Sequence, residues 1–251
     1  MRPVTVYPRG EGAIASARGL VKVYGSGETA VRALDGVDVE IERGAFTAVM
    51  GPSGSGKSTL VHCLAGLDRL TSGQALIGDT DLATLSDDEL TRLRRDRVGF
   101  VFQAFNLIPT LTAGENIDLP ARIARAELDH DWRNQVIEIL ALGDRLDHRP
   151  TELSGGQQQR VAAARALVRR PEIVFADEPS GNLDTNSAAE LLGFMRRAVD
   201  EFGQTIVMVT HDPTAAAYSD RVVFLRDGKP VDELYSPTVE SILDRLKALE
   251  A

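Results

Sequence analysis

The chain has 251 residues, 43% hydrophobic and 26% charged, which suits one α/β domain with room for an inserted subdomain. A net charge of −9 disfavours a nucleic-acid partner, and the single cysteine, Cys63, excludes an intramolecular disulfide and favours a reducing compartment. No apolar run approaches the roughly 20 residues of a membrane span, so we expect a cytoplasmic protein that reaches a membrane only through a partner.

The first part of the chain is predicted to form an antiparallel sheet. Residues 1–13 lack the apolar core of a signal peptide and are expected to form a short mobile tail. Apolar residues alternate just before Tyr24 and again over 30–34 and 37–41, as in half-buried strands. The Asp-Gly pair at 35–36 is typical of a hairpin turn, so the last two segments are expected to be separate strands.

A glycine-rich loop lies between a predicted buried strand, 45–50, and a predicted helix, 60–65. It has the P-loop pattern of glycine, four residues and Gly-Lys-Ser, which chance produces in roughly one chain of this length in a hundred. Glycines let backbone N–H groups turn inward around a phosphate, and the helix N-terminus adds its positive dipole end. Lys57 can reach the β- and γ-phosphates, and the Ser58 hydroxyl can ligate Mg²⁺. The candidate nucleotide-binding residues here are Gly51, Pro52, Ser53, Gly54, Ser55, Gly56, Lys57, Ser58 and Thr59.

The middle of the chain changes from mixed α/β to helical. A strand over 74–77 and a capping box from Ser86 to Glu89 precede a second core strand, 98–102, that ends at Gln103. The helix signals beyond it are a capping box at Thr112 and Glu115, Pro120 as the start or an interruption of a helix, helical spacing over 132–142 and Gly143 as a C-cap. We therefore expect a helical insertion, about 104–165, between two core strands.

Three more core strands are predicted, over 173–176, 205–209 and 222–225. Asp184 is expected to cap a long helix, and Ser236 and Pro237 to open a final helix as N-cap and first residue. Polar residues follow four of the core strands, namely the P-loop, Gln103, Asp177 with Glu178, and His211. Because ligands bind beyond the carboxyl ends of parallel strands, these side chains are expected to converge on one crevice.

Each of these residues has a catalytic interpretation and a plainer one. Asp177 would hold Mg²⁺, directly or through water, or else cap the next turn. Glu178 would act as general base for an attacking water, or else be an exposed acid. Gln103 would contact Mg²⁺ or that water, and His211 would bond the γ-phosphate, although alone such residues are more often solvated or structural. Tyr24 would stack on a nucleobase or serve as a core or edge aromatic.

The segment 153–160 contains a second anion-binding device. Ser154, Gly155, Gly156 and Gln157 would offer bare N–H groups, a hydroxyl and the dipole of a helix N-terminus. Since the P-loop already cradles the phosphates, two devices in one chain indicate a head-to-tail dimer, in which each copy closes on the nucleotide held by the other. The alternative is a plain Ser-capped helix.

With these motifs in order, the chain resembles the ATP-binding cassette (ABC) ATPases from about residue 15 to residue 228. The matching elements are Tyr24 as the adenine-stacking aromatic, 51–59 as Walker A, Gln103 as the Q-loop, 153–160 as the signature, Asp177 and Glu178 as Walker B and catalytic Glu, 180–184 as the D-loop ending in Asp184, and His211 as the H-loop. The resemblance implies an α/β P-loop NTPase fold: a RecA-like core with a parallel sheet, an antiparallel β subdomain and an inserted α-helical signature subdomain. One such domain would span 14–235, followed by a C-terminal helix over 236–251.

The resemblance also implies an enzyme, an ATPase that uses ATP and Mg²⁺. Its catalytic residues would be Glu178, His211, Gln103 and Lys57, with Ser58, Gln103 and Asp177 around the metal. Asp184 and the signature residues would complete the nucleotide site in a homodimer. The dimer would dock on an integral membrane permease at the inner face of the cell membrane.

A finer resemblance, to the MacB/LolD/FtsE branch, rests on 103–112 and 176–184, although Ser180 stands where the branch often has Thr. That branch works with permeases that move extracytoplasmic domains, and it extrudes macrolides, extracts lipoproteins or signals to cell-wall hydrolases. Four apolar residues after the Q-loop would either line the groove for a permease helix or pack the helical insertion: Phe105, Leu107, Ile108 and Leu111.

Other functions can be weighed on the same sequence. A regulatory ATPase like FtsE would signal to the envelope without moving cargo, and its permease would decide between the two. A non-transport ABC ATPase acting on DNA or ribosomes is disfavoured by the single cassette, the lack of a coiled coil and the acidic charge. A small-molecule kinase would have no use for the signature. We therefore expect an ATPase that drives a permease of the export or mechanotransmission type, for lipoprotein, drug or peptide efflux.

Overall fold

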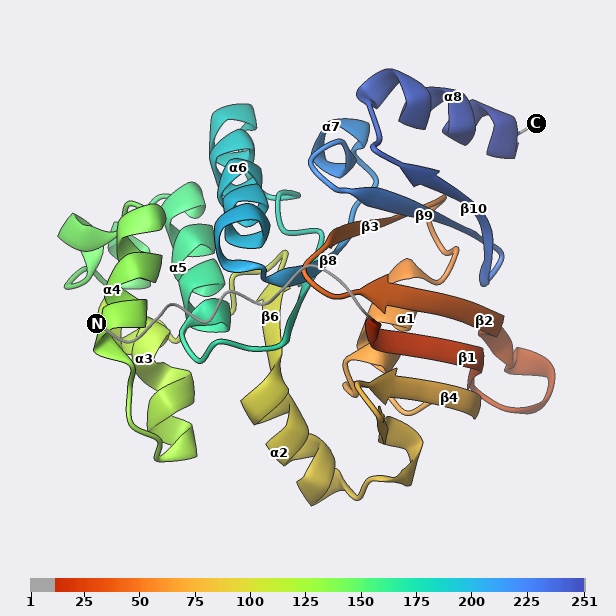
Figure 1. Ribbon diagram of the computed structural model, residues 1–251, viewed down its shortest axis with the longest axis horizontal. Coiled ribbons are helices and arrows are strands. Elements are labelled where there is room, and N and C mark those ends of the chain that lie inside the picture. Colours follow the sequence, from red (N-terminus) through yellow and green to blue (C-terminus); the bar gives the residue numbers. More distant parts are fainter. Residues whose placement is uncertain (1–11, 251) are drawn as a thin grey trace.

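The computed structural model describes residues 12–250, which form two β-sheets with helices packed around them (Figure 1). In spatial order, the larger sheet comprises β10 (Lys229–Tyr235), β9 (Arg221–Arg226), β3 (Phe46–Met50), β8 (Thr205–Val209), β7 (Ile173–Asp177) and β6 (Val98–Phe102). All of these strands are parallel except β10. The smaller sheet is antiparallel and comprises β2 (Val31–Glu42), β1 (Ala13–Tyr24), β4 (Ser72–Ile77) and β5 (Thr80–Asp81).

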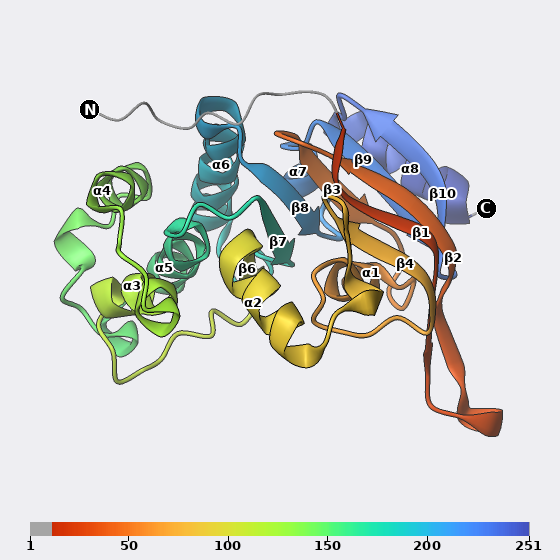
Figure 2. The ribbon, with the colours of Figure 1, turned by 60° about the horizontal axis from the view of Figure 1, so that its bottom comes forward.

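The α-helices of the described chain are α1 (Lys57–Leu64), α2 (Asp87–Arg97), α3 (Ala113–Ala124), α4 (His130–Ile139), α5 (Gly155–Leu167), α6 (Thr185–Phe202), α7 (Pro213–Ala216) and α8 (Val239–Glu250). Helices α3, α4 and α5 stand together on one side of the molecule, and the small sheet lies on the other (Figure 1). The hairpin that joins β1 and β2 projects from the body (Figure 2). Within residues 12–250, no helix is both long and apolar enough to span a membrane.

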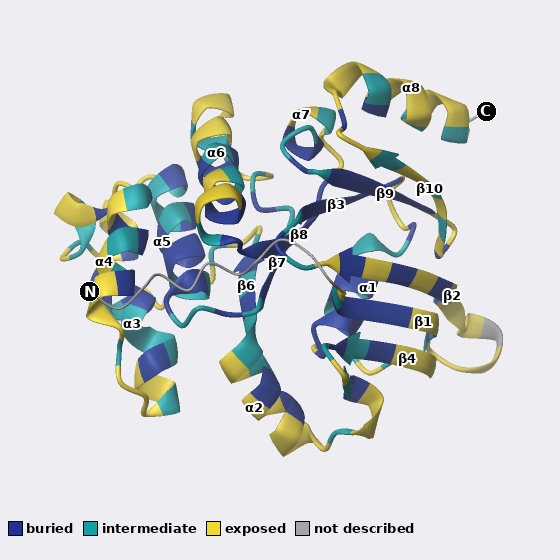
Figure 3. Ribbon diagram, viewed as in Figure 1, coloured by how far each residue is buried: buried dark blue, intermediate teal, exposed yellow. Residues whose placement is uncertain are grey.

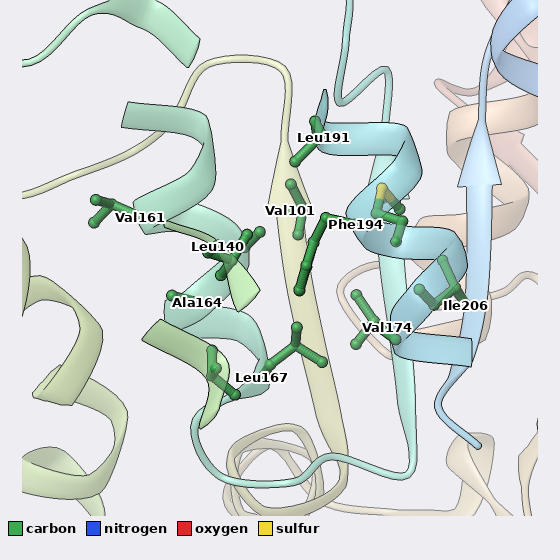
Figure 4. Close-up of a cluster of buried hydrophobic side chains, with 14 of the residues drawn as sticks. Val101, Leu140, Val161, Ala164, Leu167, Val174, Leu191, Phe194 and Ile206 are labelled. Carbon is green, nitrogen blue, oxygen red and sulfur yellow. The ribbon is translucent and has the colours of Figure 1, made fainter. Parts of the chain in front are cut away.

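Alternating side chains of the large sheet fill cores on both of its faces. Val101, Val174 and Ile206 point into a core shared with α5 and α6 (Figure 4). Their neighbours Phe175 and Val207 pack on the other face, with α1 and the small sheet. Successive strand residues face opposite sides of a sheet, so strands covered on both faces are buried along their length (Figure 3). This double burial explains why the core strands appear in the sequence as continuous apolar runs.

The predicted hairpin at 35–36 is wrong, because β2 continues through both residues and pairs with β1 along its length. Gly36 has a φ of +73°, and the register with β1 shifts between Leu20 and Val21, so Gly36 forms a β-bulge. The chain reverses instead at the 3₁₀ turn Gly27–Thr29. An Asp-Gly pair suits a turn or a bulge, and only the partner strand decides between them.

Both predicted capping boxes are present, but two predicted helix ends are wrong. Helix α4 ends before Leu140, which is its C-cap, and Gly143 opens a separate 3₁₀ turn. Helix α8 begins after Thr238, whose hydroxyl accepts a hydrogen bond from the Ser241 N–H at 3.2 Å. Ser236 lies outside the helix with a φ of +48°. Two hydroxyl residues compete for the cap here, and the one nearer the helix takes it.

Other expectations concern the ends of the domain and its insertion. The mobile tail was predicted over 1–13, of which 1–11 lie outside the described residues and Ala13 already belongs to β1. Within residues 104–165 the structure describes helices and turns and no strand. Pro120 lies inside α3, which continues to Ala124.

Candidate functional site

The loop between β3 and α1 makes a tight turn that requires glycine at its start. Gly51 has a φ of +149°, and a Cβ there would lie 2.0 Å from the Leu225 carbonyl oxygen. Ser53 and Gly54 are exposed at the tip, whereas the Ser55 hydroxyl is buried and faces inward. The loop leads into the N-terminus of α1, the geometry that binds an anion through backbone N–H groups.

Lys57, the first residue of α1, folds back over this loop. Its Nζ donates hydrogen bonds to the carbonyl oxygens of Gly51, at 3.0 Å, and Pro52, at 2.8 Å. Burial lowers the pKa of Lys57, although the negative charges of Glu178 and Asp177 oppose this effect. The ammonium group therefore lies at the loop and within the field of both strand-end carboxylates.

Two side-chain oxygen atoms that could bind a metal ion meet where β7 ends. The Ser58 hydroxyl donates to Asp177 Oδ1 at 2.9 Å. His62, one turn further along α1, places Nε2 3.5 Å from Asp177 Oδ2, a contact that the sequence analysis missed because a lone helical His carries no signal. Hydroxyl and carboxylate oxygens suit Mg²⁺, which fills its other positions with water and phosphate oxygens. Ser58 and Asp177 therefore fit a magnesium ion.

Glu178 and His211 follow neighbouring strands and meet at the same edge of the sheet. His211 Nδ1 lies 2.9 Å from Glu178 Oε1, and the Glu178 N–H donates to the Val209 carbonyl oxygen at 3.0 Å. Glu178 has a φ of +48°, an uncommon value for a residue other than glycine and typical of functional sites. The parallel strands thus bring the predicted polar residues to one edge, as expected.

The Gln103 side chain is turned toward the D-loop in this structure. Its Nε2 donates to Asn182 Oδ1 at 3.3 Å, and Asn182 Nδ2 donates to the Gln103 carbonyl oxygen at 3.0 Å. The amide packs so closely on Gly181 that a Cβ there would lie 2.9 Å from Gln103 Nε2. The amide nitrogen of Gln103 is thus engaged with the D-loop, and Asn182 is a partner for which the sequence carries no local signal.

The signature segment starts helix α5 with a capping box. The Ser154 hydroxyl accepts from the Gln157 N–H at 3.3 Å, and Gln157 Oε1 accepts from the Ser154 N–H at 2.9 Å. Gly156 is buried against α6, and a Cβ there would lie 2.6 Å from Ser187 Oγ. Ser154 itself is exposed, and Gly155 is half-buried. The plain interpretation as a Ser-capped helix is thus present, with the first turn open at the surface.

Two further polar residues tie the signature helix and the D-loop to the site. Gln159, fully buried in α5, donates from Nε2 to the carbonyl oxygens of Phe102, at 3.0 Å, and Pro179, at 2.7 Å. These carbonyl groups directly precede Gln103 and follow Glu178, and the sequence carries no signal for either contact. Asp184 caps α6, and its hydrogen bonds from Ser187 hold the pKa of its carboxyl below the usual value.

Tyr24 lies at the end of β1, outside the core. It is 41% exposed, its hydroxyl donates to Asp68 Oδ2 at 2.6 Å, and Lys22 Nζ lies 4.6 Å from the ring centre. Its hydroxyl also interacts with the side chain of Thr59 in α1. Burial and the hydrogen bond to Asp68 raise the pKa of Tyr24, so the phenol stays protonated and acts as a donor. The ring is thus an edge aromatic beside the phosphate loop.

Comparison with known proteins shows which family the chain resembles. The family model described as ABC transporter matches residues 34–181. The chain is 42% identical over 226 residues to the bacitracin export ATP-binding protein BceA of Halalkalibacterium halodurans, covering 89% of each chain. It is 46% identical over 217 residues to the macrolide export ATP-binding/permease protein MacB of Hyphomonas neptunium, covering 85% of this chain and 33% of that protein.

A solved structure shows the same fold. The ATP-binding cassette MJ0796 of Methanocaldococcus jannaschii, in a dimeric post-hydrolysis state with ADP and phosphate, matches with a TM-score of 0.80 at 40% identity. The match covers 89% of this chain and 99% of that one. The predicted P-loop NTPase fold and the predicted ATPase activity are therefore confirmed. The chain belongs to the ABC transporter family, as an ATP-binding and ATP-hydrolysing subunit.

Proposed function

We propose that two copies of this chain enclose two ATP molecules, each held by the P-loop of one copy and the start of α5 of the other. This proposal rests on one observation: the P-loop and the start of α5 belong to separate layers of the same copy. Helix α1 packs in the core under the small sheet, whereas α5 packs on the opposite face of the large sheet. The exposed start of α5 is then free to meet a second copy, and the dimeric state of the solved relative supports the same arrangement.

Within each such site, the residues divide the work of ATP hydrolysis. Lys57 and the P-loop N–H groups hold the β- and γ-phosphates. A Mg²⁺ held by Ser58 and Asp177 would supply positive charge beside these phosphates. Glu178 takes a proton from the attacking water, and His211 keeps its carboxylate in place through the 2.9 Å contact.

A groove beside β6 has the properties of a permease contact. It has a volume of about 370 Å³, and its apolar lining includes Phe100, Phe102, Leu119, Pro120 and Ile123. Arg165, which also lines the groove, donates to the carbonyl oxygens of Phe105 and Asn106, just after Gln103. We place a short permease helix here, with apolar residues toward the groove and acidic residues toward the arginines among its lining residues, Arg94, Arg95, Arg165 and Arg169. The contact would then reach the γ-phosphate side through Gln103.

The segment after the Q-loop serves this groove only indirectly. Leu107 packs on the core that the helical insertion shares with α6 and the large sheet. The loop above it is fixed by Asn116, which is fully buried, accepts from the Ile108 N–H and donates to the carbonyl oxygens of Ile108 and Leu111. Of the two roles expected for this segment, these contacts favour packing of the helical insertion for Leu107. The relatives BceA and MacB are export proteins, which supports a permease of the export type, with the chain held at the inner face of the membrane.

The rate of ATP hydrolysis per subunit is expected to rise with protein concentration, because one copy supplies only half of each site. Phosphate release should be measured across a wide dilution series, with the dimer fraction followed by sedimentation in the same buffer. A rate per subunit that stays constant while sedimentation shows only monomer would contradict the shared site.

Replacing Ile123 by Asp should prevent binding to native membranes that contain the permease, while basal ATP hydrolysis stays unchanged. Ile123 is 68% exposed at the groove in the free protein. A bound permease helix would bury this position, and burial of an unpaired carboxylate is strongly unfavourable. Co-sedimentation with the membranes measures the effect. The matched control is Leu243→Asp on α8, which is 41% exposed and lies on the helix that packs against β9 and α7, away from β6. Equal membrane binding by both variants would exclude the groove.

A further inference from the structure

Three polar side chains join the small sheet to the end of the P-loop helix. Asp68 accepts a hydrogen bond on each carboxylate oxygen, from Lys22 Nζ at 2.5 Å and from the Tyr24 hydroxyl at 2.6 Å. Lys22 also donates to the Arg69 carbonyl oxygen at 2.7 Å and lies 4.6 Å from the centre of the Tyr24 ring. Each member of the cluster therefore contacts the other two.

Packing alone does not explain a lysine at this position. Lys22 is only 9% exposed, and burial of an ammonium group is unfavourable unless it is paired and hydrogen-bonded. Both conditions are met here by Asp68 and the Arg69 carbonyl group. The arrangement fixes the lysine against one face of the Tyr24 ring, where a cation is attracted to the aromatic face.

Asp68 is in turn attached to helix α1. Its N–H donates to the His62 carbonyl oxygen at 3.2 Å, and the Leu67 N–H donates to the same oxygen at 2.9 Å. The other end of this helix carries Lys57 and the P-loop. The ring of Tyr24 belongs to β1 and the phosphate loop to the core, so Asp68 connects the two ends of a nucleotide site built from different sheets.

We propose that Lys22 and Asp68 are positioning residues for nucleoside recognition, which hold the Tyr24 ring at a fixed distance from the P-loop. The inference rests on the proposed stacking of Tyr24 on the base. Lys22 covers one face of the ring and Asp68 anchors its hydroxyl, yet 41% of the residue stays exposed for a ligand. A ring already held in place loses little freedom on binding, so the pair acts on nucleotide affinity and not on turnover.

The test compares two ligands, ADP and inorganic tripolyphosphate, which has no base. Tyr24→Leu should raise the dissociation constant of ADP about tenfold by removing the stacking surface. Tyr24→Phe and Asp68→Asn, which keep the ring, should each raise it about threefold. Tripolyphosphate should bind all variants equally, and the exposed Asp88→Asn in α2 should match wild type. Adding Asp68→Asn to Tyr24→Leu should cause no further loss, because the aspartate acts through the ring.

The outcomes separate the two proposals. If Tyr24→Leu binds ADP like wild type, the stacking role of Tyr24 is wrong. If Tyr24→Leu weakens ADP binding but Tyr24→Phe and Asp68→Asn do not, the positioning inference alone is overturned. It is also overturned if Asp68→Asn weakens tripolyphosphate equally, or adds its full effect to Tyr24→Leu, since either result indicates general damage to α1.

Discussion

Replacing Glu178 by Gln should slow ATP hydrolysis by about 10²- to 10⁴-fold, the usual contribution of a general base. Glutamine has nearly the same shape and can keep the contact with His211, now 2.9 Å from Glu178 Oε1, but it cannot accept a proton from water. ATP binding depends on the P-loop and should remain intact. The variant should therefore accumulate as an ATP-bound dimer, because closure no longer leads to hydrolysis.

Phosphate release under single-turnover conditions measures the chemical step, and sedimentation with ATP measures the dimer. The matched control is Glu201→Gln in α6, where an exposed carboxylate pairs with Arg197 at 2.7 Å, away from the strand ends. It should hydrolyse ATP at the wild-type rate. Undiminished hydrolysis by Glu178→Gln would show that another group takes the proton.

Features of the fold that depend on neighbouring residues could be predicted from the sequence. The capping boxes at 86–89 and 112–115 are formed within one helical turn, so the pattern contains both partners. The core strands are buried on both faces, and their apolar runs show it directly. The P-loop could be recognised because its pattern is local, although the glycines at 51 and 56 are also required by the close approach of the Leu225 and Ala33 carbonyl oxygens.

Features that depend on a distant partner could not be predicted in this way. Gly36 forms a bulge because β1 pairs on both sides of it, which no local pattern reveals. Gln103 meets Asn182 across 79 residues of sequence, and Lys22 meets Asp68 across 46. A buried polar side chain needs a partner, but the sequence does not say which one. The convergence of the strand ends was predictable because parallel topology alone places them at one edge.

The division of the site between two copies leads to the last prediction, on mixed dimers. Lys57→Ala removes the P-loop ammonium group, and Ser154→Arg fills the exposed start of α5 with a long side chain. Each variant alone should be almost inactive, since every site contains the defect. In a mixed dimer both defects fall in one site, which leaves the other intact. Random mixing should therefore restore about a quarter of wild-type activity in a two-fold symmetric dimer.

A second mixture shows whether recovery comes from shared sites or merely from the mixing of two inactive variants. Lys57→Ala and Glu178→Gln both lie on the P-loop side of a site, so every site in their mixed dimer keeps one defect. This mixture should stay inactive, although it is prepared and measured in the same way. Recovery in both mixtures, or in neither, would contradict a site built from the P-loop of one copy and the α5 start of the other. If only the mixture of Lys57→Ala with Ser154→Arg recovers activity, the two copies must share their sites, because neither mixture contains an intact chain.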